Sequence, residues 1–214
     1  MENSNIRRYL VLNGWNSLFA AAAFLFAVML AGAPASADDE YLRDGDIPLG
    51  AEDAPVTIIE YASMTCPHCA AFHTETMPQL KKEYVDTGKV RFIFREFPLD
   101  RIALRASMVA RCAKPEKYYN FIDFLFKQQR SWLSSPDPIA ALGRMASFGG
   151  MKKETFDRCM QDRDLKNEIM ATRLHGDKEM GVQATPTLFV NGEMIPGAAS
   201  FETLDKKLRK ILGN

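Results

Sequence analysis

The first half of the chain carries the hydrophobic pattern of two strands with a helix between them. Residues 56–61 form a short β-branched run, and residues 90–97 alternate between apolar and polar side chains, so each run predicts a core strand. Between them, apolar residues at helical spacing predict a helix that begins at Cys66 and ends at Gly88. The glycines and prolines of residues 44–55 indicate a lead-in rather than an element.

The second half starts with a long helical pattern and then returns to strands. From about 101 to 181, apolar residues recur every three or four positions. The helices predicted there cover residues 104–112, 118–125, 139–148, 152–161 and 165–180. A strand at 187–190, a tight turn at Asn191-Gly192, a returning strand at 193–195 and an amphipathic helix at 201–212 follow. This order predicts an α/β protein with an all-helical insertion.

The N-terminal residues have the pattern of an export signal. Arg7 and Arg8 precede residues 9–37, which contain no charged side chain and end in Ala35-Ser36-Ala37. A positive start, an apolar middle and a small-x-small ending predict a signal peptide, residues 1–37, cleaved after Ala37. An uncleaved membrane anchor is the alternative, because the uncharged stretch is long enough to span a bilayer. The arginine pair also leaves twin-arginine export open.

Charge and cysteine usage narrow the function further. The formal net charge is zero and no basic run occurs, so the sequence offers no electrostatic surface for nucleic acid. All four cysteines (Cys66, Cys69, Cys112 and Cys159) lie beyond the predicted signal peptide. An even number of cysteines in an exported protein indicates an oxidising compartment with disulfides present.

Cys66-Pro67-His68-Cys69 follows the first predicted strand and opens the first predicted helix. The helix start offers unpaired N–H groups and partial positive charge to the first sulfur, which favours the reactive thiolate at Cys66. Pro67 fits the first helical turn, where its missing N–H costs nothing. His68 adds positive charge or an N–H donor, and Cys69 lies one turn along, shielded from solvent. The motif therefore predicts a redox-active pair.

Two other interpretations of the motif stay open at this point. Half of a zinc site is one, although no second cysteine pair stands at ligand spacing and we expect no metal. His73, four residues after Cys69, is a conceivable ligand, but on a helix we expect it to be a surface residue. A purely structural disulfide is the other, although a two-residue spacer is short for that purpose.

Two segments carry a family resemblance. Residues 60–69, EYASMTCPHC, resemble the active-site segment of the DsbA family of periplasmic thiol oxidases. Residues 182–192, VQATPTLFVNG, are similar to the segment with the cis-proline of thioredoxin-like proteins. The resemblance implies a thioredoxin-like fold in two parts, residues 38–100 and 182–214, with a helical insertion at 101–181. It also implies an acidic first thiol and a strongly oxidising disulfide, as in DsbA itself.

The resemblance assigns roles to residues of both segments. Cys66 is implied to be the nucleophile and Cys69 the resolving thiol, with His68 tuning the pair. Pro186 is implied to be the cis-proline, which would leave the Thr185 backbone free to pair with an extended substrate. A strand-entry proline in trans is the alternative. The best-known oxidases carry valine before the cis-proline, whereas this chain has Thr185. In this respect the position resembles that of disulfide isomerases.

Glu60 lies inside the apolar first strand, six residues before Cys66. A carboxylate in such a place needs a partner, and the resemblance implies a buried proton acceptor for Cys69. The alternative is a glutamate on an edge strand that faces water.

Cys112 and Cys159 form an additional pair in the helical block. Cys112 shares a helix face with Leu104 and Met108, and Cys159 follows Phe156 by three residues, so both should face inward. Export favours a structural disulfide between them. Two buried free thiols are the alternative.

These observations together predict a thiol–disulfide oxidoreductase that donates the Cys66–Cys69 disulfide to folding exported proteins. The resemblance implies a periplasmic monomer that is reoxidised by a membrane protein of the DsbB type and needs no cofactor beyond its own disulfide. A disulfide isomerase or reductase of the same fold is the first alternative. A metal-binding or peptide-binding module without turnover is the second.

Overall fold

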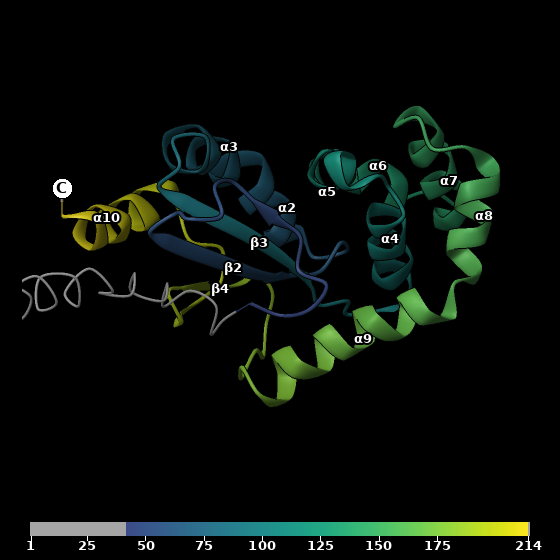
Figure 1. Ribbon diagram of the computed structural model, residues 1–214. Helices are drawn as coiled ribbons and strands as arrows, with labels where there is room; N and C mark the ends of the chain where they lie inside the picture. Colours follow the sequence, from purple (N-terminus) through teal and green to yellow (C-terminus); the bar gives the residue numbers. More distant parts are fainter. Residues whose placement is uncertain (1–41, 214) are drawn as a thin grey trace, which may run out of the picture. The chain divides into compact units, whose positions relative to one another are not determined.

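A five-stranded sheet forms the centre of the region that the computed structural model describes, residues 42–213 (Figure 1). The strands are β1 (Pro48–Leu49), β2 (Val56–Ala62), β3 (Val90–Glu96), β4 (Thr187–Val190) and β5 (Glu193–Pro196). Their order is β1-β3-β2-β4-β5, with β2 and β3 parallel and the other neighbours antiparallel. The predicted signal peptide, residues 1–37, and its cleavage site lie outside the described residues.

The central strand β2 is buried along its whole length, and so is β3. Successive residues of β2 point to opposite faces of the sheet and pack into different clusters. Ile58 belongs to the larger hydrophobic core and Ile59 to a smaller one. Glu60 pairs in register with Phe94 of β3 and Leu188 of β4. Since side chains alternate along a strand, Glu60 faces the same core as Ile58.

The structure adds detail to the sequence pattern in two places. The lead-in at residues 44–55 contains a strand, the two-residue β1, which exists through its antiparallel pairing with β3 and has no pattern of its own. The helix after Cys66 is not one regular α-helix. It alternates between α-helical and π-helical turns. Its segments are α2 (Pro67–Ala71), η2 (Phe72–Thr76), α3 (Met77–Leu80) and η3 (Lys81–Val85).

Helices fill the chain between β3 and β4. They are α4 (Arg101–Arg111), η4 (Pro115–Lys117), α5 (Tyr118–Lys127), α6 (Gln129–Leu133), α7 (Pro138–Phe148), α8 (Lys153–Gln161) and α9 (Arg163–Lys178). Figure 1 shows α4 to α8 gathered beside the sheet, and the long α9 running back toward it. Aspartates accept a backbone hydrogen bond at the starts of three of these helices, Asp100, Asp137 and Asp162.

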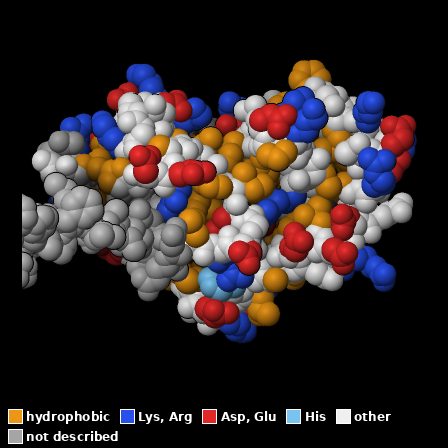
Figure 2. Space-filling view, in the orientation of Figure 1, with side chains coloured by type: hydrophobic (Ala, Val, Ile, Leu, Met, Phe, Trp, Pro, Cys, Tyr) orange, Lys and Arg blue, Asp and Glu red, His pale blue; other side chains and the backbone are white. Residues whose placement is uncertain are grey.

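The C-terminal helix α10 (Phe201–Leu212) packs against α3 and buries Leu204 and Leu208. On the face shown in Figure 2, acidic and basic side chains are interspersed, with hydrophobic side chains between them. None of the helices within residues 42–213 combines the length and the apolar character needed to cross a membrane.

Candidate active site

Cys66 stands at the boundary between an extended segment and the helix α2. Its backbone is extended (φ −77°, ψ 121°), and Pro67 occupies the first helical turn. Cys66 is 6% exposed, and its Sγ donates a hydrogen bond to the carbonyl oxygen of Thr185, 3.2 Å away. The structure therefore brings residues 60–69 and 182–192, the two segments that carry the family resemblance, together at the Cys66 sulfur.

The surroundings of Cys66 make its thiol acidic. Its pKa falls from an ordinary 9.0 to about 5, mainly because the Cys69 thiol hydrogen-bonds to it. The hydrogen bond with Thr185 and the backbone N–H groups of Cys69 and His68 lower the pKa further, against the opposing effect of burial. The His68 imidazole itself is exposed, so His68 acts on the sulfur through its backbone.

The Cys69 thiol, in contrast to that of Cys66, is not acidic. Its side chain has no exposure to solvent, and burial raises the pKa of its thiol. The neighbouring Cys66 and the charge of Glu60 raise this pKa further. Both thiols are free in the structure. An acidic thiol beside a strongly non-acidic one gives the two sulfurs different tasks in any exchange reaction.

Glu60 lies in the central strand β2 and is 0% exposed, so the structure excludes the alternative of a water-facing glutamate on an edge strand. Its Oε2 lies 2.8 Å from Nε2 of His73. Its Oε1 is buried and has no hydrogen-bond partner within the described part of the chain.

The expectation that His73 lies on the surface was wrong. His73 is 2% exposed, and its Nδ1 lies 3.3 Å from Oδ1 of Asp123 in α5. The sequence did contain an indication that His73 is buried. Residues four apart on a helix share a face, and Cys69, four residues earlier, points inward. The carboxylates that make burial of this imidazole favourable come from distant segments, which the sequence pattern does not connect.

Thr185 and Pro186 flank the sulfur from the other side of the site. The Thr185–Pro186 peptide bond is cis, and Pro186 is buried whereas Thr185 is partly exposed. Thr65 adds a further contact: its Oγ1 donates to Oδ2 of Asp100, 2.7 Å away, and Asp100 also caps α4. The loop before Cys66 is thus attached to the first inserted helix.

Gln129 is a site residue that sequence reasoning missed. It is 7% exposed in the short helix α6, which was not predicted. Its Nε2 donates to the carbonyl oxygens of Met64 and Cys66, each 2.9 Å away. The helical insertion therefore holds both ends of the turn that presents Cys66.

Replacing Gln129 by leucine should destabilise the protein by about 2 kcal/mol, because the carbonyl oxygens of Met64 and Cys66 each lose a buried side-chain donor and that of Cys66 keeps only the Ala70 N–H. Urea unfolding measures this loss. The matched control is Gln128→Leu, since Gln128 is the exposed neighbour. A change at Gln129 no larger than the change at Gln128 would show that water replaces the amide.

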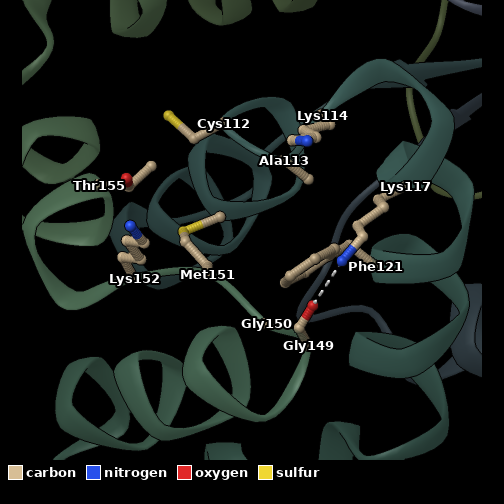
Figure 3. Close-up of a pocket in the computed structure, with 10 residues that line it drawn as sticks. All are labelled: Cys112, Ala113, Lys114, Lys117, Phe121, Gly149, Gly150, Met151, Lys152 and Thr155. Atoms are coloured by element: carbon tan, nitrogen blue, oxygen red, sulfur yellow. Dashed lines mark hydrogen bonds between the residues drawn. The ribbon is translucent and has the colours of Figure 1, made fainter.

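Cys112 and Cys159 form a disulfide between the end of α4 and α8, with their Cα atoms 6.1 Å apart. Cys159 is 2% exposed, whereas Cys112 borders a cavity of about 300 Å³ (Figure 3). In this cavity Lys117 reaches the carbonyl oxygen of Gly149. None of the residues around Cys66 lines it, so the cavity and the Cys66 site are separate.

Within residues 42–213, no group of three or more His, Cys, Asp and Glu side chains is arranged to hold a metal ion. The contacts that Cys66 and Cys69 make are instead with each other, Thr185 and nearby backbone groups.

Comparison with known proteins agrees with this geometry. The family model described as Thioredoxin matches residues 43–210. The chain is 30% identical to disulfide bond formation protein D of Bacillus subtilis, covering 77% of this chain and 76% of that protein. It is 34% identical over 152 residues to a relative from Rickettsia bellii, but spans only 59% of the length of that relative.

The structure is also similar to a solved one. The crystal structure of Wolbachia pipientis alpha-DsbA1 superposes with a TM-score of 0.77 at 32% identity, covering 83% of this chain and 96% of that chain. The predicted thioredoxin-like fold is confirmed by these matches. The chain therefore belongs to the thioredoxin family, and within that family it is a DsbA-like protein.

Proposed function

We propose that the chain is a thiol–disulfide oxidoreductase that donates the Cys66–Cys69 disulfide to folding exported proteins. The contrast between the two thiols carries this proposal. Cys66, which is 6% exposed, has a pKa of about 5, whereas the pKa of the fully buried Cys69 is raised. A stable Cys66 thiolate favours the reduced pair, and a disulfide whose reduced form is stabilised is a strong oxidant.

The exchange has two steps. A substrate thiolate attacks Sγ of Cys66, forms a mixed disulfide with it, and breaks the Cys66–Cys69 bond, whose electron pair leaves with Cys69. A second substrate thiolate then attacks the first substrate sulfur and expels Cys66 as a thiolate. The substrate loses two electrons and gains a disulfide, and the pair gains those electrons. The low pKa of Cys66 makes it a good leaving group in the second step.

The surroundings of Cys66 suit a protein substrate. The Thr185 carbonyl oxygen lies beside the sulfur, and we propose that the Thr185 backbone pairs with an extended substrate segment there.

We further propose that the protein acts in the periplasm as a monomer and is reoxidised by a membrane protein of the DsbB type. The export pattern of residues 1–37 and the Cys112–Cys159 disulfide support an oxidising compartment. The redox pair is proposed to need no further cofactor.

A disulfide isomerase or reductase is the second candidate, and Thr185 is the residue that favours it. The redox state of Cys66 and Cys69 in living cells distinguishes the two, since an oxidase is kept oxidised and an isomerase reduced. Retention of zinc by the purified reduced protein would instead favour a binding module without turnover.

A Cys69→Ala variant should accumulate mixed disulfides with exported proteins: its Cys66 thiolate attacks a disulfide of such a protein, one of that protein's sulfurs leaves as a thiolate, and no Cys69 thiol is present to release the other. Non-reducing electrophoresis of cell extracts, quenched with acid, measures these species. The control is a Cys66→Ala/Cys69→Ala variant, in which they should disappear. A folded Cys69→Ala protein that traps no partner would contradict the proposed function.

A further inference from the structure

The proposed function requires a proton to reach the buried Cys69 sulfur and to leave it again. When the Cys66–Cys69 bond opens, the Cys69 sulfur departs as a thiolate in a place with no exposure to solvent. Burial and the nearby charges strongly favour its protonated form, so one proton must arrive. When the pair is oxidised again, that proton must leave.

A line of polar groups runs from the neighbourhood of Cys69 to the surface. Glu60 raises the pKa of Cys69 by its charge, and the Oε1 of Glu60 is free of hydrogen bonds among the described residues. Its Oε2 lies 2.8 Å from Nε2 of His73, and Nδ1 of His73 lies 3.3 Å from Oδ1 of Asp123. The Asp123 side chain is 36% exposed, so the line ends in solvent.

Aromatic rings also pack around His73. Phe126 of α5 stacks on the imidazole with ring centroids 4.4 Å apart, and Phe72, Phe92 and Phe94 present ring edges to it. From β2 it meets Glu60, and from α5 it meets Asp123; β3 and the neighbouring helical turn contribute only rings. These two carboxylates are therefore the charged groups in contact with His73 within the described part of the chain.

We infer that Glu60, His73 and Asp123 form a proton relay that couples the protonation of Cys69 to solvent on the side of the inserted helices. This inference deepens the proposed function and rests on it. Glu60 exchanges a proton with Cys69 at its free Oε1, while its Oε2 keeps the hydrogen bond from Nε2–H of His73. His73 and Asp123 act through Glu60 and do not touch the sulfurs.

The relay works through charge balance. In the reduced protein Glu60 is a carboxylate, and His73 between two carboxylates is an imidazolium, whose pKa these carboxylates raise to about 9 against the effect of burial. When Cys69 loses its proton on oxidation, Glu60 takes it up and becomes neutral. A buried imidazolium without its counter-ion is unfavourable, so His73 releases its Nδ1 proton through Asp123 to water.

The reverse sequence protonates Cys69 when a substrate opens the disulfide. Glu60 gives its Oε1 proton to the Cys69 sulfur and becomes a carboxylate. His73 then takes a proton from water at Nδ1, beside Asp123, and becomes an imidazolium again. One proton moves between Glu60 and Cys69 and one between His73 and solvent, so neither the oxidised nor the reduced state leaves the charge of Glu60 or of His73 unpaired.

The protonation state of the His73 imidazole tests the relay directly. The chain has three histidines, and nitrogen NMR of the imidazoles distinguishes a doubly from a singly protonated ring. At pH 7, His73 should carry protons on both nitrogens in the reduced protein and on Nε2 alone after oxidation by glutathione disulfide. His175, whose Nδ1 lies 3.1 Å from the Tyr61 hydroxyl, should not change and serves as the internal control. A His73 ring with the same protonation in both forms would overturn the relay.

An Asp123→Asn variant tests the exit of the relay and leaves the Glu60–His73 contact in place. Its rate of reduction by a model dithiol peptide should fall about tenfold, because the proton exchange at His73 loses its carboxylate. Rising concentrations of imidazole buffer at constant pH should restore the rate, which a merely structural defect would not allow. Asp157→Asn, which removes an exposed carboxylate of α8, is the matched control.

The outcomes separate the two proposals. Wild-type protein that exchanges disulfides while Asp123→Asn keeps the full rate would contradict the relay and leave the proposed function intact. Wild-type protein that does not exchange disulfides with the peptide would contradict the proposed function. The NMR measurement still decides on the relay in that case, because glutathione disulfide oxidises the pair without a protein substrate.

Discussion

The reduced protein is expected to gain stability over the form oxidised at Cys66–Cys69 as the pH rises from 4 to 7. The cause is the Cys66 thiolate, whose pKa of about 5 in the folded protein lies below the ordinary 9.0. A lowered pKa stabilises the folded state fully above the ordinary value, and the effect disappears as the pH falls through about 5.

The magnitude follows from the distance between the pH and this pKa. At pH 7 about two pH units of the shift are realised, or roughly 2.7 kcal/mol at about 1.4 kcal/mol each. Solvent near the sulfur screens part of the interaction, so we expect about 1–2 kcal/mol. The oxidised form has a loop-closure gain, but the Cys66–Cys69 loop is short and this gain does not depend on pH. The raised pKa of Cys69 keeps that thiol protonated over this range.

Thermal and urea unfolding of both forms at pH 4 and pH 7 measure the effect, with the Cys112–Cys159 disulfide kept oxidised throughout. For a domain of this size, 1 kcal/mol corresponds to about 2–4 °C in Tm. A Cys66→Ser variant, studied reduced, supplies the control, because it should lack the added pH dependence. A stability difference between the two forms that stays the same at both pH values would show that Cys66 is not acidic and would favour a reductase.

The parts of the fold that were predicted correctly are those with a local pattern. The run at 56–61 became β2 with one residue added, and the alternating run at 90–97 became β3. Each is a short apolar segment bounded by turn residues, which is sufficient for a buried strand. The Cys66 motif was also local, since it depends on a strand, a turn and a helix start that are adjacent in sequence.

The parts that could not be predicted depend on partners far away in the chain. Gln129 stands 63 positions from Cys66, whose carbonyl oxygen it binds, and Asp123 stands 50 positions from His73. A polar side chain gives no sign in the sequence of which distant group will satisfy it, so a buried glutamine or histidine looks like a surface residue. The strand β1 depends in the same way on its pairing with β3.

Removing the Cys112–Cys159 disulfide should lower the free energy of unfolding by about 4 kcal/mol. The bond closes a loop across 47 positions of the chain, and the restriction of the unfolded ensemble grows with the length of that loop. A Cys112→Ala/Cys159→Ala variant is the suitable replacement, because alanine puts no hydroxyl into the site of Cys159, which is 2% exposed.

The measurement is urea unfolding of the wild-type and double-variant proteins, with Cys66 and Cys69 held in the same redox state in both. The m-value should rise in the variant, because the uncrosslinked unfolded chain exposes more surface. The rate at which Cys66 reacts with an alkylating reagent should stay the same, since the disulfide joins α4 to α8 away from the residues that contact Cys66. A loss of less than about 1 kcal/mol would mean that the packing of these helices already restricts the chain, whereas slower alkylation would mean that the helical insertion tunes the active thiol.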